Sequence, residues 1–110
     1  MANIKEIKNL EEYNEFINNS NSLNVTKLGA QWCGPCRILE QTLNNLTDEE
    51  VKGVLLAEIN VDDEWFEDKA VELKIRGIPV IIAFKDGVEV DRIVGAAPKD
   101  ILLAFINRNL

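Results

Sequence analysis

The hydrophobic and polar positions of the chain alternate between helical and extended patterns. Apolar residues recur every three or four positions in four segments, which predicts amphipathic helices at 10–18, 36–46, 66–73 and from residue 98 onward. Between them lie apolar, β-rich runs that predict strands at 23–30, 54–61, 80–84 and 88–94, with a further short strand at 4–7. Strands that alternate with helices indicate an α/β domain whose central sheet is covered on both faces.

Local signals mark where several of these elements begin and turn. Asn9 followed by Glu12 matches a helix cap with a reciprocal carboxylate, and Asp86-Gly87 is the dipeptide favoured in two-residue hairpin turns. Pro98 suits the start of the last helix. We expect the inward faces of the first, second and last helices to carry Leu10, Tyr13, Ile17, Ile38, Leu39, Thr42, Leu43, Leu46, Ile101, Leu102, Phe105, Ile106 and Leu110.

Length and composition fit one globular domain. The 110 residues, 46% hydrophobic and 28% charged, can bury a core without a metal or a disulfide, and we assign 1–110 to a single domain. The N-terminal segment lacks the apolar core of a signal peptide, and no apolar run approaches membrane-spanning length. We therefore expect a cytoplasmic protein that does not associate with membranes, and we expect a monomer. The net charge of −7, much of it in a run near Asp62 that we interpret as a solvated loop, argues against nucleic-acid binding.

Two cysteines and the absence of histidine restrict the chemistry of the chain. Two thiolates do not complete a mononuclear zinc site without further ligands, and a Cys–His nucleophile is excluded. A lone structural disulfide would help little in a cytosolic protein, where thiols are kept reduced. Redox chemistry by the pair itself remains, with a cluster shared between two chains as the alternative.

The run Cys33-Gly34-Pro35-Cys36 lies between a predicted strand and a predicted helix. Unpaired amides at a helix N-terminus stabilise a thiolate, which is the reacting form of cysteine. We expect Cys33 to be exposed to a partner, and Cys36 to be shielded yet close enough to attack a mixed disulfide. Trp32 offers a flat apolar surface for docking, unless it belongs to the core.

These residues and three later motifs resemble the thioredoxin family. The run Trp32-Cys33-Gly34-Pro35-Cys36 looks like the family's active site, and the supporting motifs follow in the family's order: Arg76-Gly77-Ile78-Pro79, Phe84-Lys85-Asp86-Gly87 and Val94-Gly95-Ala96. The resemblance implies the thioredoxin fold, an α/β architecture with a central mixed sheet of four to five strands flanked by four helices. It also implies a protein-disulfide reductase that works by dithiol–disulfide exchange without a cofactor or metal, with electrons supplied by a thioredoxin reductase-like protein.

The resemblance further implies a role for each matching residue. Cys33 would attack the disulfide of a protein substrate, and Cys36 would resolve the mixed disulfide. Pro79 would be the family's cis-proline, although most X–Pro bonds are trans, and Ile78 would pair its backbone with an extended segment of the substrate. The substrate-binding surface would consist of Trp32, Gly34, Pro35, Ile78, Pro79, Gly95 and Ala96.

Beneath the cysteines the sequence departs from the family pattern. The position of the family's buried Asp is Lys27, and the position of its Lys partner on the neighbouring strand is Glu58. One interpretation is that the two side chains face solvent and are unrelated. Because both lie in apolar strands, we instead hypothesise a reversed ion pair, in which Glu58 accepts the proton of Cys36 and Lys27 favours the thiolate. Gly29 replaces a large aromatic residue, which predicts looser packing near the site.

Besides the cluster shared between two chains, two alternatives to a reductant remain open. The exchanged charges favour a more oxidising enzyme, since a cation near the sulfurs favours their reduced, anionic form. The other alternative is a binding module that uses the same apolar surface without redox chemistry. Substitution of Cys33 separates the two classes, because a module would keep its binding function and an enzyme would lose its activity.

Overall fold

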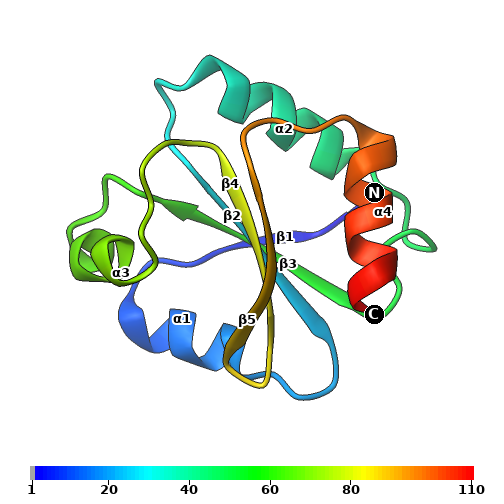
Figure 1. Ribbon diagram of the computed structural model, residues 1–110, viewed down its shortest axis with the longest axis horizontal. Coiled ribbons are helices and arrows are strands. Elements are labelled where there is room, and N and C mark those ends of the chain that lie inside the picture. The colour runs from blue at the N-terminus through cyan, green and yellow to red at the C-terminus, as the bar shows by residue number, and fades with distance from the viewer. Residues whose placement is uncertain (1) are drawn as a thin grey trace.

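A five-stranded mixed sheet forms the centre of the structure, a computed structural model that describes residues 2–110 (Figure 1). The strand order is β1-β3-β2-β4-β5. β1 and β2 run parallel to β3, whereas β4 is antiparallel to β2 and β5 is antiparallel to β4. The strands are β1 (Ile4–Glu6), β2 (Leu23–Gly29), β3 (Val54–Asn60), β4 (Val80–Lys85) and β5 (Val88–Val94).

Helices cover both faces of this sheet, with α1 and α3 on one side and α2 and α4 on the other (Figure 1). They are α1 (Leu10–Ile17), α2 (Gly34–Asn44), α3 (Glu67–Glu72) and α4 (Lys99–Asn109), and a short 3-10 helix, η1 (Glu64–Phe66), precedes α3. The predicted α/β architecture is confirmed, including the short strand at the front of the chain. Within residues 2–110, no helix combines the length and apolar character that a membrane crossing requires.

The structure confirms two of the local signals. Asn9 Oδ1 accepts a hydrogen bond of 2.8 Å from the backbone N–H of Glu12, and Glu12 Oε1 accepts one of 2.7 Å from the N–H of Lys8. The reciprocal carboxylate therefore reaches the residue before the cap. In the β4–β5 hairpin, Asp86 and Gly87 adopt φ angles of 51° and 81°, the left-handed pair that a type I′ turn requires.

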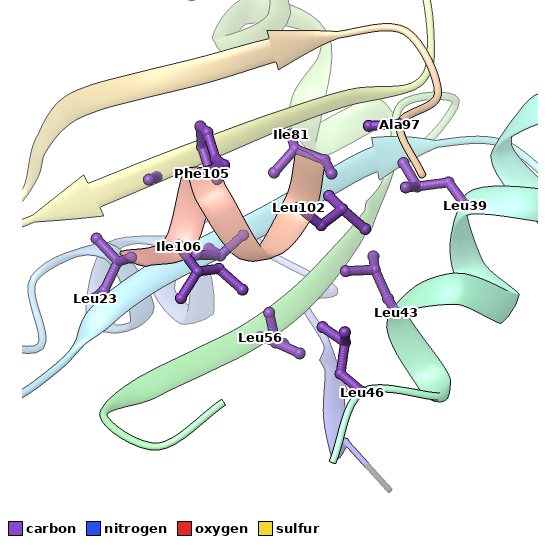
Figure 2. Close-up of a cluster of buried hydrophobic side chains, with 12 residues drawn as sticks. Leu23, Leu39, Leu43, Leu46, Leu56, Ile81, Ala97, Leu102, Phe105 and Ile106 are labelled. Atoms are coloured by element: carbon purple, nitrogen blue, oxygen red, sulfur yellow. The ribbon is translucent and has the colours of Figure 1, made fainter. Parts of the chain in front are cut away.

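Two hydrophobic cores lie on opposite faces of the sheet. Figure 2 shows the core beneath α2 and α4, where Leu39, Leu43 and Leu102 meet apolar side chains of the strands. The second core joins α1 and η1 to the other face through Tyr13 and Phe66. Each helix layer therefore packs on its own face of the sheet, and this packing fixes the positions of the loops that join the helices to the strands.

Four residues predicted to face inward lie at the surface instead: Leu10, Ile38, Ile101 and Leu110. In α2 the buried side chains are Cys36, Leu39 and Leu43. Apolar spacing identifies a helical face only to within about one position, so residues at the edge of a stripe are the ones misassigned. Thr42, at the same edge, is half-buried, and its hydroxyl donates to the carbonyl of Ile38.

Candidate active site

The loop between β2 and α2 holds the two cysteines. Cys33 is the N-cap of α2, and its Sγ accepts a hydrogen bond of 3.2 Å from the backbone N–H of Cys36. Pro35 lies in the first turn, where its missing N–H is not needed. Because the cap and the proline both favour a helix start, α2 begins at Gly34 rather than at Cys36.

Cys33 and Cys36 form a disulfide bond, with their Cα atoms 5.2 Å apart. Cys33 is 5% exposed and Cys36 is 1% exposed. The predicted shielding of Cys36 is confirmed, whereas Cys33 is more covered than predicted, because its sulfur is bonded to that of Cys36 and accepts a hydrogen bond from the N–H of Cys36. Cys33 is still the more accessible of the two.

The peptide bond between Ile78 and Pro79 is cis, as the resemblance implied. Leu28 pairs with Val80 in the antiparallel β2–β4 ladder, so the residue before β4 lies at the sheet edge where β2 leads into the cysteine loop. The carbonyl of Pro79 accepts a hydrogen bond of 2.8 Å from the N–H of Gly95. The loops before β4 and after β5 are thereby joined at the same edge.

The residues predicted to bind substrate come from three loops at this edge. Trp32, Gly34, Pro35 and Ala96 are exposed, Ile78 and Gly95 are half-buried, and Pro79 is buried. Trp32 is 70% exposed, which excludes the interpretation that it belongs to the core. Its indole N–H donates a hydrogen bond of 2.7 Å to Asp62 Oδ2. Sequence reasoning missed this partner, because Asp62 looked like part of a solvated acidic run.

Lys27 and Glu58 are in register on β2 and β3 and form an ion pair, with 3.4 Å between Lys27 Nζ and Glu58 Oε2. Their side chains are 8% and 27% exposed. Val25, two residues earlier on β2, belongs to the core beneath α2, and strand alternation places Lys27 on that same face. The predicted reversed ion pair is confirmed, and the solvent-facing interpretation is wrong for Lys27.

Glu40 of α2 is a third member of this charged cluster, and the sequence analysis did not identify it. Its Oε2 lies 4.0 Å from Lys27 Nζ. Glu40 follows Cys36 by one helical turn, so both side chains leave the same face of α2. The four-residue spacing between Cys36 and Glu40 was the signal in the sequence that could have identified Glu40. Within residues 2–110, no group of three or more His, Cys, Asp or Glu side chains is arranged to hold a metal ion.

A cleft of about 390 Å³ opens beside the charged cluster and reaches Cys36. Gly29 lines this cleft, and a Cβ at Gly29 would lie 3.1 Å from Cys36 Sγ and 3.7 Å from Lys27 Cε. The backbone of Gly29 therefore lies directly against the sulfur of Cys36. The looser packing predicted at this position is therefore not found at the sulfur, where the contact is close.

Comparison with known proteins places this geometry in a family. A model of the Thioredoxin family matches residues 4–108. A thioredoxin of Chlamydia caviae is 38% identical over 104 residues, which cover 94% of this chain and 97% of the relative. The mitochondrial thioredoxin of Mus musculus is 33% identical over 97 residues, which cover 88% of this chain and 57% of that protein. The X-ray structure of Fasciola hepatica thioredoxin aligns with a TM-score of 0.84 and 31% identity, covering 97% of this chain and 100% of that one.

The structural similarity confirms the thioredoxin fold that the resemblance implied. The family match also runs through the elements that position the site, from β1 into α4. The chain therefore belongs to the thioredoxin family, and since the cysteine pair at the start of α2 supplies the redox chemistry, it is a protein thiol–disulfide oxidoreductase.

Proposed function

We propose that this oxidoreductase reduces disulfide bonds in other proteins, with Cys33 as the attacking cysteine and Cys36 as the resolving one. The observation that supports the direction of attack is the greater accessibility of Cys33 within a pair bonded at the N-terminus of α2. Gly34 and Pro35 separate the cysteines, and no histidine stands between them to stabilise a thiolate, which favours a reductant over an oxidase.

The proposed cycle starts from the reduced protein. The Cys33 thiolate attacks one sulfur of the substrate disulfide; a bond forms to Cys33 Sγ, the substrate's S–S bond breaks, and the released thiolate takes a proton from water. Cys36 then loses its proton, and its thiolate attacks Cys33 Sγ. The Cys33–Cys36 bond forms as the mixed disulfide breaks, and the second substrate thiolate is protonated. The substrate gains two electrons and two protons in total, and the protein ends as the disulfide.

The N-terminus of α2 assists the first step. The backbone N–H of Cys36 that donates to Cys33 Sγ points at the atom that carries negative charge in the reduced protein. The positive end of the helix dipole acts on the same sulfur. Both effects favour the Cys33 thiolate without any contribution from a histidine.

We assign substrate docking to the edge formed by the three loops around the cysteines. Trp32 is exposed and anchored by Asp62, so it presents a fixed apolar face beside Cys33. The hydrogen bond from Gly95 to the Pro79 carbonyl fixes the segment in which Ile78 would pair with an extended substrate backbone. A protein substrate would then place its disulfide over Cys33.

We assign Glu58 as the acceptor of the Cys36 proton and Lys27 as the cation that favours the Cys36 thiolate. The cleft that reaches Cys36 is lined by both side chains and is large enough for water molecules to connect them. Lys27 Cε and Cys36 Sγ face the same position in front of Gly29. A cation at that position favours the reduced form, so the couple is more oxidising than it would be with a carboxylate there.

We also propose that the protein acts as a cytoplasmic monomer and receives electrons from a thioredoxin reductase-like donor. A dithiol reductant needs a reducing compartment and a regenerating donor, which supports this setting. Three of its relatives are named as mitochondrial. Fractionation of the source cells tests the compartment, and light scattering of the purified chain tests the monomer.

Reduction of insulin disulfides tests the proposed reaction. We expect the wild-type protein to accelerate insulin reduction, Cys33→Ser to fall to the uncatalysed rate, and Cys36→Ser to accumulate a mixed disulfide through Cys33. Cys36→Ser is the matched control, because it removes the other sulfur but leaves the first step intact. A wild-type protein that does not accelerate the reaction, yet still binds partners after Cys33→Ser, would identify a binding module and overturn the proposal.

A further inference from the structure

We propose that Glu40 is a positioning residue for the redox reaction, because it shares the Lys27 ammonium with Glu58 and so limits how strongly that charge favours the Cys36 thiolate. The inference rests on the proposed ionisation of Cys36 during the cycle. It adds a residue from α2 to a cluster otherwise built from the sheet.

The distances show a cation held between two carboxylates. Lys27 Nζ lies 3.4 Å from Glu58 Oε2 and 4.0 Å from Glu40 Oε2. Both separations exceed the roughly 2.7–2.9 Å of a charge-assisted hydrogen bond, so the ammonium is not locked onto either oxygen. An ammonium carries three N–H donors and a flexible stem, which allows it to divide its contacts between the two partners.

The cluster faces Cys36 across a small gap. The Cβ position of Gly29 is in contact range of both Cys36 Sγ and Lys27 Cε, at 3.1 Å and 3.7 Å. With no side chain at Gly29, no heavy atom of residue 29 stands at that position between the lysine stem and the sulfur. A shift of the Lys27 ammonium toward or away from Glu40 therefore changes the charge that Cys36 experiences.

Burial makes that charge effective. The Lys27 side chain is 8% exposed, so water screens it weakly, whereas Glu40 is 41% exposed and lies at the mouth of the cleft. One ammonium facing two carboxylates leaves the cluster with an excess of one negative charge, which opposes a thiolate at Cys36. Removal of the Glu40 charge would leave the ammonium opposed by Glu58 alone.

Four other charged residues line the cleft, and their charges also act on this site. They are Glu6 from β1, Lys8 after it, Arg37 from α2 and Asp63 after β3. Two are cationic and two are anionic, so their charges largely cancel. Among residues 2–110 none of the four forms an ion pair with Lys27, whose carboxylate partners there are Glu40 and Glu58.

The test follows ionisation of Cys36 by the ultraviolet absorbance of its thiolate, in a Cys33→Ser background that leaves one sulfur. We expect Glu40→Gln to raise the thiolate fraction of Cys36 at a fixed pH about threefold, because the Lys27 ammonium then no longer divides its contacts between two carboxylates. Glu15→Gln on α1 is the matched control, since it removes the same charge from the opposite layer and leaves the titration unchanged. An unchanged titration in Glu40→Gln overturns the proposal.

A double-mutant cycle separates positioning from a direct effect of the Glu40 charge. In a Lys27→Met background, we expect Glu40→Gln to produce less than half of the shift that it produces when Lys27 is present. An equal shift in both backgrounds would mean that Glu40 acts on Cys36 directly, and would also overturn the proposal. Circular dichroism of each variant confirms folding. Because these titrations need neither insulin nor Cys33, they succeed or fail independently of the proposed reductase activity.

Discussion

Lys27 lies in β2, a strand in which every residue is buried. Val25 and Leu28 are core residues on either side of it, and a lone charge at such a position would be strongly unfavourable. Glu58 and Glu40 compensate that charge from β3 and α2. A buried pair of this kind adds little net stability, which supports the proposal that it acts on the thiol.

Replacement of Lys27 by aspartate is expected to make the Cys33–Cys36 couple more reducing. The change exchanges a cation that favours the thiolate for an anion that opposes it, so the reduced form loses stability. We expect the equilibrium constant with glutathione to change at least about threefold, or about 14 mV, in that direction. The measurement is the oxidised fraction of the protein in glutathione redox buffers.

Two further variants serve as controls for this prediction. Lys27→Met, which removes the cation without crowding three carboxylates together, should shift the couple in the same direction by a smaller amount. Lys52→Asp, at an exposed position, makes the same change of net charge and should leave the potential unchanged. A Lys27→Asp protein that is folded and no more reducing than wild type contradicts the electrostatic argument.

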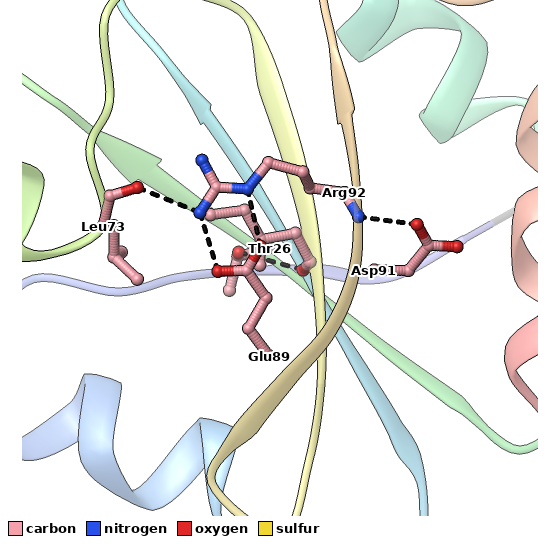
Figure 3. Close-up of polar contacts among 6 residues, drawn as sticks. Thr26, Leu73, Glu89, Asp91 and Arg92 are labelled. Atoms are coloured by element: carbon pink, nitrogen blue, oxygen red, sulfur yellow. Dashed lines mark hydrogen bonds and ion pairs between the residues drawn. The ribbon is translucent and has the colours of Figure 1, made fainter.

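At the scale of elements, Arg92 connects β5 to Leu73, the residue at the end of α3 (Figure 3). Its guanidinium donates hydrogen bonds of 2.6 Å and 2.7 Å to the two carboxylate oxygens of Glu89. The same guanidinium donates one of 2.9 Å to the carbonyl of Leu73, the C-cap of α3. Lys74, which follows, has a φ of 58°, so the chain turns sharply there before it reaches Pro79.

Arg92→Met is expected to loosen residues 74–78 and to lower the free energy of unfolding by about 1–3 kcal/mol, because the Leu73 carbonyl loses a charged donor. Faster amide hydrogen exchange in that segment, with little change in α4, is the measurable sign. Arg92→Lys should restore little, since an ammonium does not reproduce the two parallel bonds to Glu89. Unaltered exchange at 74–78 in Arg92→Met would show that the segment is fixed by other contacts.

The elements that the sequence predicts well are those encoded by neighbouring residues. The Asn9 cap, the Asp86-Gly87 turn and the placement of the cysteines between a strand and a helix each depend on a few consecutive positions, and all three are found in the structure. Glu40 and Asp62 were missed because their contacts depend on how far a side chain reaches from one element to another. The Lys27–Glu58 pair was accessible only because strand register could be counted from the family motif.

At the scale of the whole molecule, α4 is attached at both ends by carboxylates from distant parts of the chain. Asp91 of β5 accepts hydrogen bonds of 2.8 Å from both Arg108 and Asn109 near the C-terminus of the helix. Glu50 lies 3.1 Å from the ammonium of Lys99 at its N-terminus. The last helix, which closes one core of the sheet, is therefore held in place by two groups that acid can neutralise.

The stability of the protein should consequently fall on acidification. Hydrogen bonds from Arg108 and Asn109 hold the pKa of Asp91 below its ordinary 3.8, and the backbone N–H of Thr47 together with Lys99 holds the pKa of Glu50 below its ordinary 4.5. The unfolded chain then binds protons at these carboxyls at a higher pH than the folded chain does. Their contribution is complete above about pH 5 and is lost as the pH falls through and below 4.

Urea denaturation at a series of pH values from 7 to 3 measures this loss. Asp91→Asn and Glu50→Gln should each be less stable than wild type at pH 7 and should each show a shallower decline toward pH 3, because the titrating group has been removed. The double variant should show the shallowest decline of all, since the two carboxylates act at opposite ends of α4. Glu15→Gln, the same charge change on α1, should keep the wild-type slope. If the double variant declines as steeply as wild type, the attachment of α4 is not what makes the fold sensitive to acid.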